Sequence, residues 1–156
     1  MSIIPPQPYN SIDIKIYIDA QQLTGLVKET FCDIKYNDKM VMMQLDTSGE
    51  DGDYAITNDL SATIEFKLRQ KASGNDLLLD KFLADLNGGT GGFHLIIYDN
   101  NSKIKYEAAV AHVEKFPDKS YANELQTLSW AVITTRLVPT RIENIDVYIQ
   151  NFSVNV

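Results

Sequence analysis

The sequence predicts a mainly β protein: an antiparallel β-sandwich or open barrel with one flanking α-helix at about residues 73–87. Several segments alternate apolar and polar side chains, which is the pattern of a strand with one face buried and the other in water. Short runs of turn residues separate these segments, and this favours hairpins and therefore antiparallel pairing. Only one segment has apolar residues at helical spacing, so we expect a single helix lying against the sheet.

The N-terminal third predicts three strands of unequal strength. Three early prolines keep residues 1–10 extended and outside any central strand. The cleanest alternation follows at residues 12–18, and a weaker strand is predicted at residues 31–36. Residues 39–45 are rich in methionine and predict a strand that lies near the core or at a subunit contact.

The segment from Asp46 to Asp53 is polar, acidic and contains two glycines, and it therefore predicts a flexible loop or a hairpin tip. Its acidic residues lack the spacing of an EF-hand calcium loop, and no helices are predicted beside it. After this loop, residues 54–57 are expected to lead into a strand at residues 62–68, where apolar and polar residues alternate strictly.

Residues 73–87 predict the helix, with Ser73 as the N-cap and Asp76 adding negative charge to the first turn. Four large apolar residues share one side of it, which we expect to dock on the sheet: Leu79, Phe82, Leu83 and Leu86. The glycine-rich run at residues 88–92 follows a helix and precedes a strand, whereas a phosphate-binding loop follows a strand and precedes a helix. We therefore expect a helix C-cap and a tight connection there.

A hairpin is predicted after this connection. In residues 93–98 the positions that would face either side of a strand are mainly apolar, which is typical of a strand covered on both faces. Turn residues at 99–102 join this strand to a second arm at residues 104–113, and Pro117 ends that arm.

Two further strands are predicted near the C-terminus. Residues 125–135 form the first, in which Trp130 belongs to the core. Pro139 is expected to interrupt the chain before the last strand at residues 144–150. Apolar residues then alternate with polar ones along residues 152–156, and without obvious cover they indicate contact with another chain.

Composition sets limits on the function. A chain of 156 residues is long enough for one domain with its own core, and we expect residues 1–156 to form a single domain. The net charge is −7, and no basic cluster is present that could release counterions from DNA, so we expect DNA to be repelled rather than held. No apolar run is long enough to span a bilayer, and no secretory signal is expected. The single cysteine, Cys32, fits synthesis in a reducing compartment.

The residues that usually carry catalysis do not form a recognisable group in this sequence. His94 and His112 lie in strand patterns without clustered acidic or cysteine ligands, so we interpret both as structural. Cys32 is interpreted as a small buried residue because nothing near it in the sequence marks a reactive thiolate. We therefore expect no enzymatic activity, no cofactor and no bound metal.

Two stretches of the chain resemble a known family. The first runs from Ser61-Ala62-Thr63-Ile64 through the helix to Asp99, and the second contains Lys115-Phe116-Pro117, Ser120, Glu124, Thr127 and Trp130. Together they are similar to the tail tube proteins of contractile-tailed bacteriophages, over about residues 54–137.

The resemblance implies a tail-tube-like fold, in which two packed antiparallel sheets close towards a barrel beside one helix. It also implies hexameric rings of this chain that stack into a hollow tube inside a contractile sheath, on a baseplate. DNA would pass through the lumen into the host without specific binding. The protein would be made in the bacterial cytoplasm and reside in the virion tail. The family has no active site to carry over.

Contacts between rings are expected at the acidic loop and at the C-terminal residues. The candidates are Asp46, Thr47, Ser48, Gly49, Glu50, Asp51, Gly52 and Asp53, together with Phe152, Val154 and Val156. Two alternatives stay open: another tail component or a secretion or tailocin tube, and a small β-barrel protein that binds a ligand in an apolar pocket.

Overall fold

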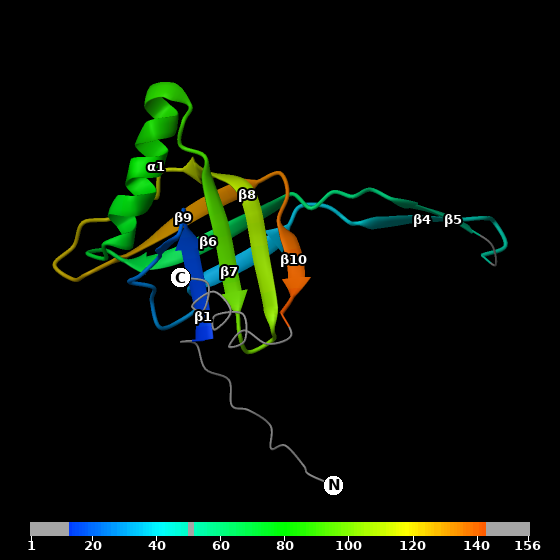
Figure 1. Ribbon diagram of the computed structural model, residues 1–156, viewed down its shortest axis with the longest axis horizontal. Helices are drawn as coiled ribbons and strands as arrows, with labels where there is room; N and C mark the ends of the chain where they lie inside the picture. The colour runs from blue at the N-terminus through cyan, green and yellow to red at the C-terminus, as the bar shows by residue number, and fades with distance from the viewer. Residues whose placement is uncertain (1–12, 50–51, 143–156) are drawn as a thin grey trace, which may run out of the picture.

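Most strands of the chain join one antiparallel sheet that curls into an open barrel (Figure 1). The computed structural model describes residues 13–49 and 52–142. The strands of this sheet are β1 (Ile14–Ile18), β2 (Gln21–Gln22), β3 (Cys32–Tyr36), β6 (Ala62–Arg69), β7 (Phe93–Asp99), β8 (Ile104–Lys115), β9 (Thr127–Thr134) and β10 (Val138–Arg141).

The strand order is β2-β1-β7-β8-β9-β6-β3, and β10 pairs with β8 beside this path. Within the described residues the two ends of the path, β2 and β3, do not pair with each other. The observed form is therefore the open barrel among the predicted alternatives. A mainly β, antiparallel fold with a flanking helix is confirmed.

The predicted alternation places the core inside this curved sheet. Every second residue of β6 is buried, from Ala62 to Leu68, and β9 does the same with Leu128, Trp130 and Val132. The opposite residues of both strands remain partly or fully exposed, as a strand with one wet face requires. On β7 the prediction of cover on both faces is wrong. Phe93, Leu95 and Ile97 are buried, but the residues that alternate with them are only half-buried.

Pro139 does not interrupt the chain as predicted. It lies within β10, where it is opposite Tyr106 of β8. β10 is a short strand outside the main path of the sheet, and a proline is tolerated where its missing N–H is not needed by a neighbouring strand.

Helix α1 (Gly74–Gly88) connects β6 to β7 within one residue of the predicted bounds. Ser73 is at the N-cap but its side chain does not cap the helix; its Oγ lies 3.2 Å from Thr24 Oγ1 instead. Gly89 has a φ of 69° and closes the helix, as expected for a left-handed C-cap.

The apolar contacts of α1 with the barrel end at Phe82. Leu78 is fully buried, and Leu79 and Phe82 pack against the core. Leu83 and Leu86 are 39% and 69% exposed, so the prediction that they share the docked side is wrong. The reason is geometric, since the C-terminal turns of α1 extend beyond the end of the sheet (Figure 1).

The remaining two strands, β4 (Val41–Leu45) and β5 (Gly52–Ile56), form a separate two-stranded sheet. This hairpin projects away from the barrel (Figure 1). Residues 39–45 are therefore not near the core of their own chain, and residues 54–57 do not lead directly into β6 as predicted. The expected extended segments 1–10 and 152–156, and the expected strand at residues 144–150, lie outside the described residues.

Candidate assembly surface

The hairpin of β4 and β5, called the arm below, has one apolar face. Directly opposed residues in an antiparallel pair point to the same side, and neighbours along a strand point to opposite sides. The register pairs Val41 with Ile56 and Met43 with Tyr54. With Leu45, these side chains form the apolar face of the arm, and each is 47–75% exposed: Val41, Met43, Leu45, Tyr54 and Ile56.

The arm is fastened at its base but not along its length. Thr57 N–H donates to Met40 O at 2.8 Å, and the Thr57 hydroxyl donates to Lys39 O at 2.7 Å. Asn37 N–H donates to Ser61 O at 3.0 Å where the chain leaves and rejoins the barrel. From Val41 to Leu45 the strand of the arm extends about 13 Å, at about 3.3 Å for each residue.

An isolated two-stranded hairpin is marginally stable in water, and a contiguous exposed apolar patch usually marks an interaction site. Every residue of β4 and β5 is exposed in this chain. The arm therefore has the composition of a contact element and lacks the cover that would stabilise it.

The tip of the arm is an ordered turn with negative charge. Asp46 Oδ1 accepts hydrogen bonds from the N–H groups of Ser48 at 3.0 Å and Gly49 at 2.9 Å. It also accepts the Ser48 hydroxyl at 2.7 Å. Gly49 has a φ of 74°, a conformation that suits glycine.

The predicted contact residues are thus divided between two places. Residues 46–49 form the tip, and Gly52 and Asp53 begin β5. The other predicted contact residues lie outside the described residues: Glu50, Asp51, Phe152, Val154 and Val156. Sequence reasoning missed the apolar face as a set, although its signal is present as alternating apolar residues on both sides of an acidic turn.

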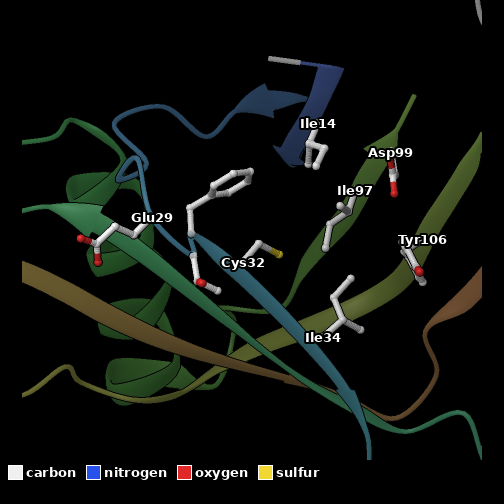
Figure 2. A pocket seen from close by; sticks show the side chains of 9 residues that line it. Ile14, Glu29, Cys32, Ile34, Ile97, Asp99 and Tyr106 are labelled. Carbon is white, nitrogen blue, oxygen red and sulfur yellow. The ribbon is translucent and has the colours of Figure 1, made fainter. Parts of the chain in front are cut away.

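A pocket of about 400 Å³ lies where the barrel stays open. In Figure 2, Cys32 and Ile34 of β3 face Ile97 of β7 and Tyr106 of β8 across it. Burial raises the pKa of the Cys32 thiol to about 12, with a smaller contribution from the negative charge of Asp33. The thiol is therefore protonated near neutral pH and is a poor nucleophile.

The two histidines hold elements of the fold together. His112 Nδ1 on β8 lies 2.7 Å from Asp85 Oδ2 on α1, and the pKa of Asp85 is lowered chiefly by this hydrogen bond. His94 Nε2 lies 3.7 Å from Glu107 Oε1, and its backbone N–H donates to Asp19 Oδ1 at 2.9 Å.

Two kinds of site are absent from residues 13–49 and 52–142. These residues contain no group of three or more His, Cys, Asp or Glu side chains that could hold a metal ion. They also contain no helix with the length and apolar composition that crossing a membrane requires.

Comparison with solved structures identifies the fold. A chain of the anti-feeding prophage cap, which terminates that tube, matches with a TM-score of 0.60 at 10% identity, over 90% of this chain and 96% of that one. A chain of the PVC sheath/tube terminator, from an extracellular contractile injection system, matches with a TM-score of 0.59 at 11% identity, over 88% and 99%. The chain shares the fold of these tail components.

A third match comes from the tail of an empty gene transfer agent particle, refined with C6 symmetry. Its TM-score is 0.59 at 13% identity, and it covers 86% of this chain and 98% of that one. At the level of sequence, no family model and no curated protein matches.

Proposed function

We propose that this chain is a structural subunit of a contractile phage tail tube, and that it assembles into hexameric rings that stack around a lumen. The observation that carries the proposal is the apolar face of the arm, whose five large side chains are uncovered in the single chain. The shared fold and the C6 symmetry of one matching tail support the ring. Its partners are then copies of itself, the sheath and the baseplate, in the tail of the virion.

The charge of the chain fits a conduit for DNA. A net charge of −7 gives the surface no general attraction for a polyanion, and DNA can slide past such a wall without being held. Ejection through the lumen then needs no specific binding residue on this chain.

A second candidate is a terminator or cap subunit, which forms one ring at the end of the tube. It is favoured by the two matches to a tube-terminating cap and a sheath/tube terminator. The two candidates differ in whether rings of this chain stack on one another.

Electron microscopy and sedimentation of the purified full-length chain test both candidates. Stacked rings support the tube subunit, single rings support the terminator, and a monomer at every concentration contradicts both.

The role of the arm is tested by Met43→Ser, which we expect to shift assembly to at least tenfold higher protein concentration. Met42→Ser is the matched control, because Met42 is 55% exposed but lies on the other face of the same strand. Equal effects of the two substitutions would contradict a contact through the apolar face.

A further inference from the structure

A β-bulge on β8 creates a groove on the barrel wall. Phe93 of β7 pairs with Ala111 but Leu95 pairs with Ala108, so β8 contains one extra residue between these positions. A bulge of this kind turns side chains away from the regular pleat. Val110 is 55% exposed as a result, and its carbonyl accepts the Thr134 hydroxyl at 2.8 Å.

The sheet also divides at this point. On the edge of β8 away from β7, Glu107 is opposite Val138 of β10, whereas Ala111 is opposite Thr134 of β9. Between these pairs the two neighbouring strands diverge. The divergence leaves a groove of about 500 Å³ with Ala109, Val110 and Val138 as its apolar wall.

The rim of the groove is mainly basic. Lys105 and Arg136 line it. Glu107 is the acidic residue of the lining, and it lies 3.3 Å from Lys105 Nζ. The groove therefore offers aliphatic contact inside and positive charge at the edge.

The arm has the complementary chemistry. Its apolar face carries four aliphatic side chains and Tyr54, and its tip carries Asp46. The sequence from residue 40 to residue 66 contains no lysine or arginine. Opposite charges around an apolar contact fix orientation and select the partner.

We propose that the arm of one copy lies in the β8–β10 groove of a second copy, with Met43 and Leu45 against Val110 and Val138 and the acidic tip beside Arg136. The arm projects away from its own barrel, so its partner groove belongs to another chain (Figure 1). Such a contact joins two different surfaces of identical subunits, and contacts of this type close into rings or continue as filaments. The inference rests on the proposed function, because it requires that this chain assembles with itself.

Cysteine cross-linking tests the contact directly. In a Cys32→Ala background, one preparation carries Met43→Cys and a second carries Val110→Cys. After mixing and mild oxidation we expect a covalent dimer that neither preparation forms alone. Leu86→Cys in place of Val110→Cys is the matched control, since Leu86 is exposed on α1 outside the groove, and it should give at least tenfold less product.

Exchange of charges provides a second test that does not depend on the cysteine variants. Arg136→Glu and Asp46→Lys at the tip should each reduce assembly at least fivefold, and the double variant should recover most of it. Asp80→Arg on the exposed side of α1 is the control for adding positive charge, and it should not rescue Arg136→Glu.

The outcomes separate this inference from the proposed function. If the cysteine variants form rings but give no Met43–Val110 cross-link, or give only dimers linked Met43 to Met43, the groove contact is wrong and the tube subunit is still supported. Rings that are insensitive to the charge exchange do the same, and they indicate a different occupant of the groove. A wild-type chain that never assembles removes the proposed function and the contact together.

Discussion

Trp130 Nε1 on β9 donates a hydrogen bond to Asn75 Oδ1 at 2.9 Å, which ties the core of the sheet to the first turn of α1. Asn75 Nδ2 in turn donates hydrogen bonds to Arg69 O at 2.8 Å and to Gln70 O at 3.0 Å. Asn75 therefore satisfies one buried donor and two carbonyls at the junction between β6 and the helix.

Replacing Asn75 with alanine should destabilise the fold. The indole N–H of Trp130, whose side chain is 1% exposed, loses its acceptor, and an unsatisfied buried donor costs about 1–3 kcal/mol. Urea denaturation followed by the fluorescence of Trp130, the single tryptophan, measures the change. Asn87→Ala, near the exposed end of the same helix, should change the free energy of unfolding by less than about 0.5 kcal/mol. Equal effects would show that the Trp130 contact contributes nothing.

Two glycines at opposite ends of α1 should respond to alanine with opposite signs. A Cβ at Gly74 would lie 2.5 Å from Leu68 Cδ2 and 2.7 Å from the carbonyl oxygen of Thr24, so the helix would have to move off the sheet. Overpacking of this kind costs about 1–3 kcal/mol. A Cβ at Gly88 would meet nothing within 4 Å, and Gly88→Ala should stabilise the helix by about 0.5 kcal/mol. Thermal unfolding of both variants checks the pair, and a stable Gly74→Ala protein would contradict the close approach.

The contact between Asp85 and His112 should make stability depend on pH in the acidic range. The hydrogen bond from His112, aided by the Gly91 N–H, lowers the pKa of Asp85 below its ordinary value. A carboxyl group with a lowered folded-state pKa contributes stability above its unfolded pKa of about 3.9, and this contribution disappears as pH falls through the folded value.

The measurement is the difference in unfolding free energy between wild type and Asp85→Asn at several pH values. We expect the full difference above about pH 4. The difference should be lost at more acidic pH, where the protonated carboxyl of Asp85 is as uncharged as the amide of the variant. Asp80→Asn removes the same charge from the exposed side of α1 and corrects for net charge. A difference that does not change between pH 6 and pH 2 is the result that this pairing does not allow.

Strict alternation made β6 and β9 predictable. A strand with one buried face needs an apolar residue at every second position, and residues 62–68 satisfy this without exception. The helix bounds were predictable for a similar reason, since Gly89 supplies the left-handed conformation that ends it. Local rules decide these features, and local rules can be evaluated on one sequence.

Features that depend on distant parts of the chain could not be predicted in this way. Leu83 and Leu86 have the spacing of a docked face, but the helix is longer than the sheet beneath it. Pro139 was expected to interrupt the chain, yet β10 tolerates it because it lies beside the main path of the sheet. In both cases the size and edge of the barrel decide the outcome.

The arm shows why the candidate site was only partly predictable. A methionine-rich strand has the same composition whether it is buried in its own chain or against another, so residues 39–45 were compatible with both. The sequence analysis predicted the contact residues in the acidic loop because loops often carry binding residues. The structure adds the apolar face behind this loop, which requires knowing that β4 pairs with β5 and not with the barrel.

Removal of the arm should separate assembly from folding. Deleting residues 40–57 joins Lys39 to Asn58 and leaves a short connection between β3 and β6, whose last register pair is Tyr36 with Ala62. The exposed arm contributes little to the core, and shortening a loop changes its closure entropy only slowly, so the unfolding free energy should stay within about 1 kcal/mol of wild type.

Assembly should respond differently, because the deletion removes the whole apolar face. We expect a folded monomer by sedimentation, at concentrations where the wild-type chain forms rings. Urea denaturation of the same preparation shows that the barrel is intact, which rules out unfolding as the cause. A deletion variant that still forms rings would place the assembly contact elsewhere on the barrel.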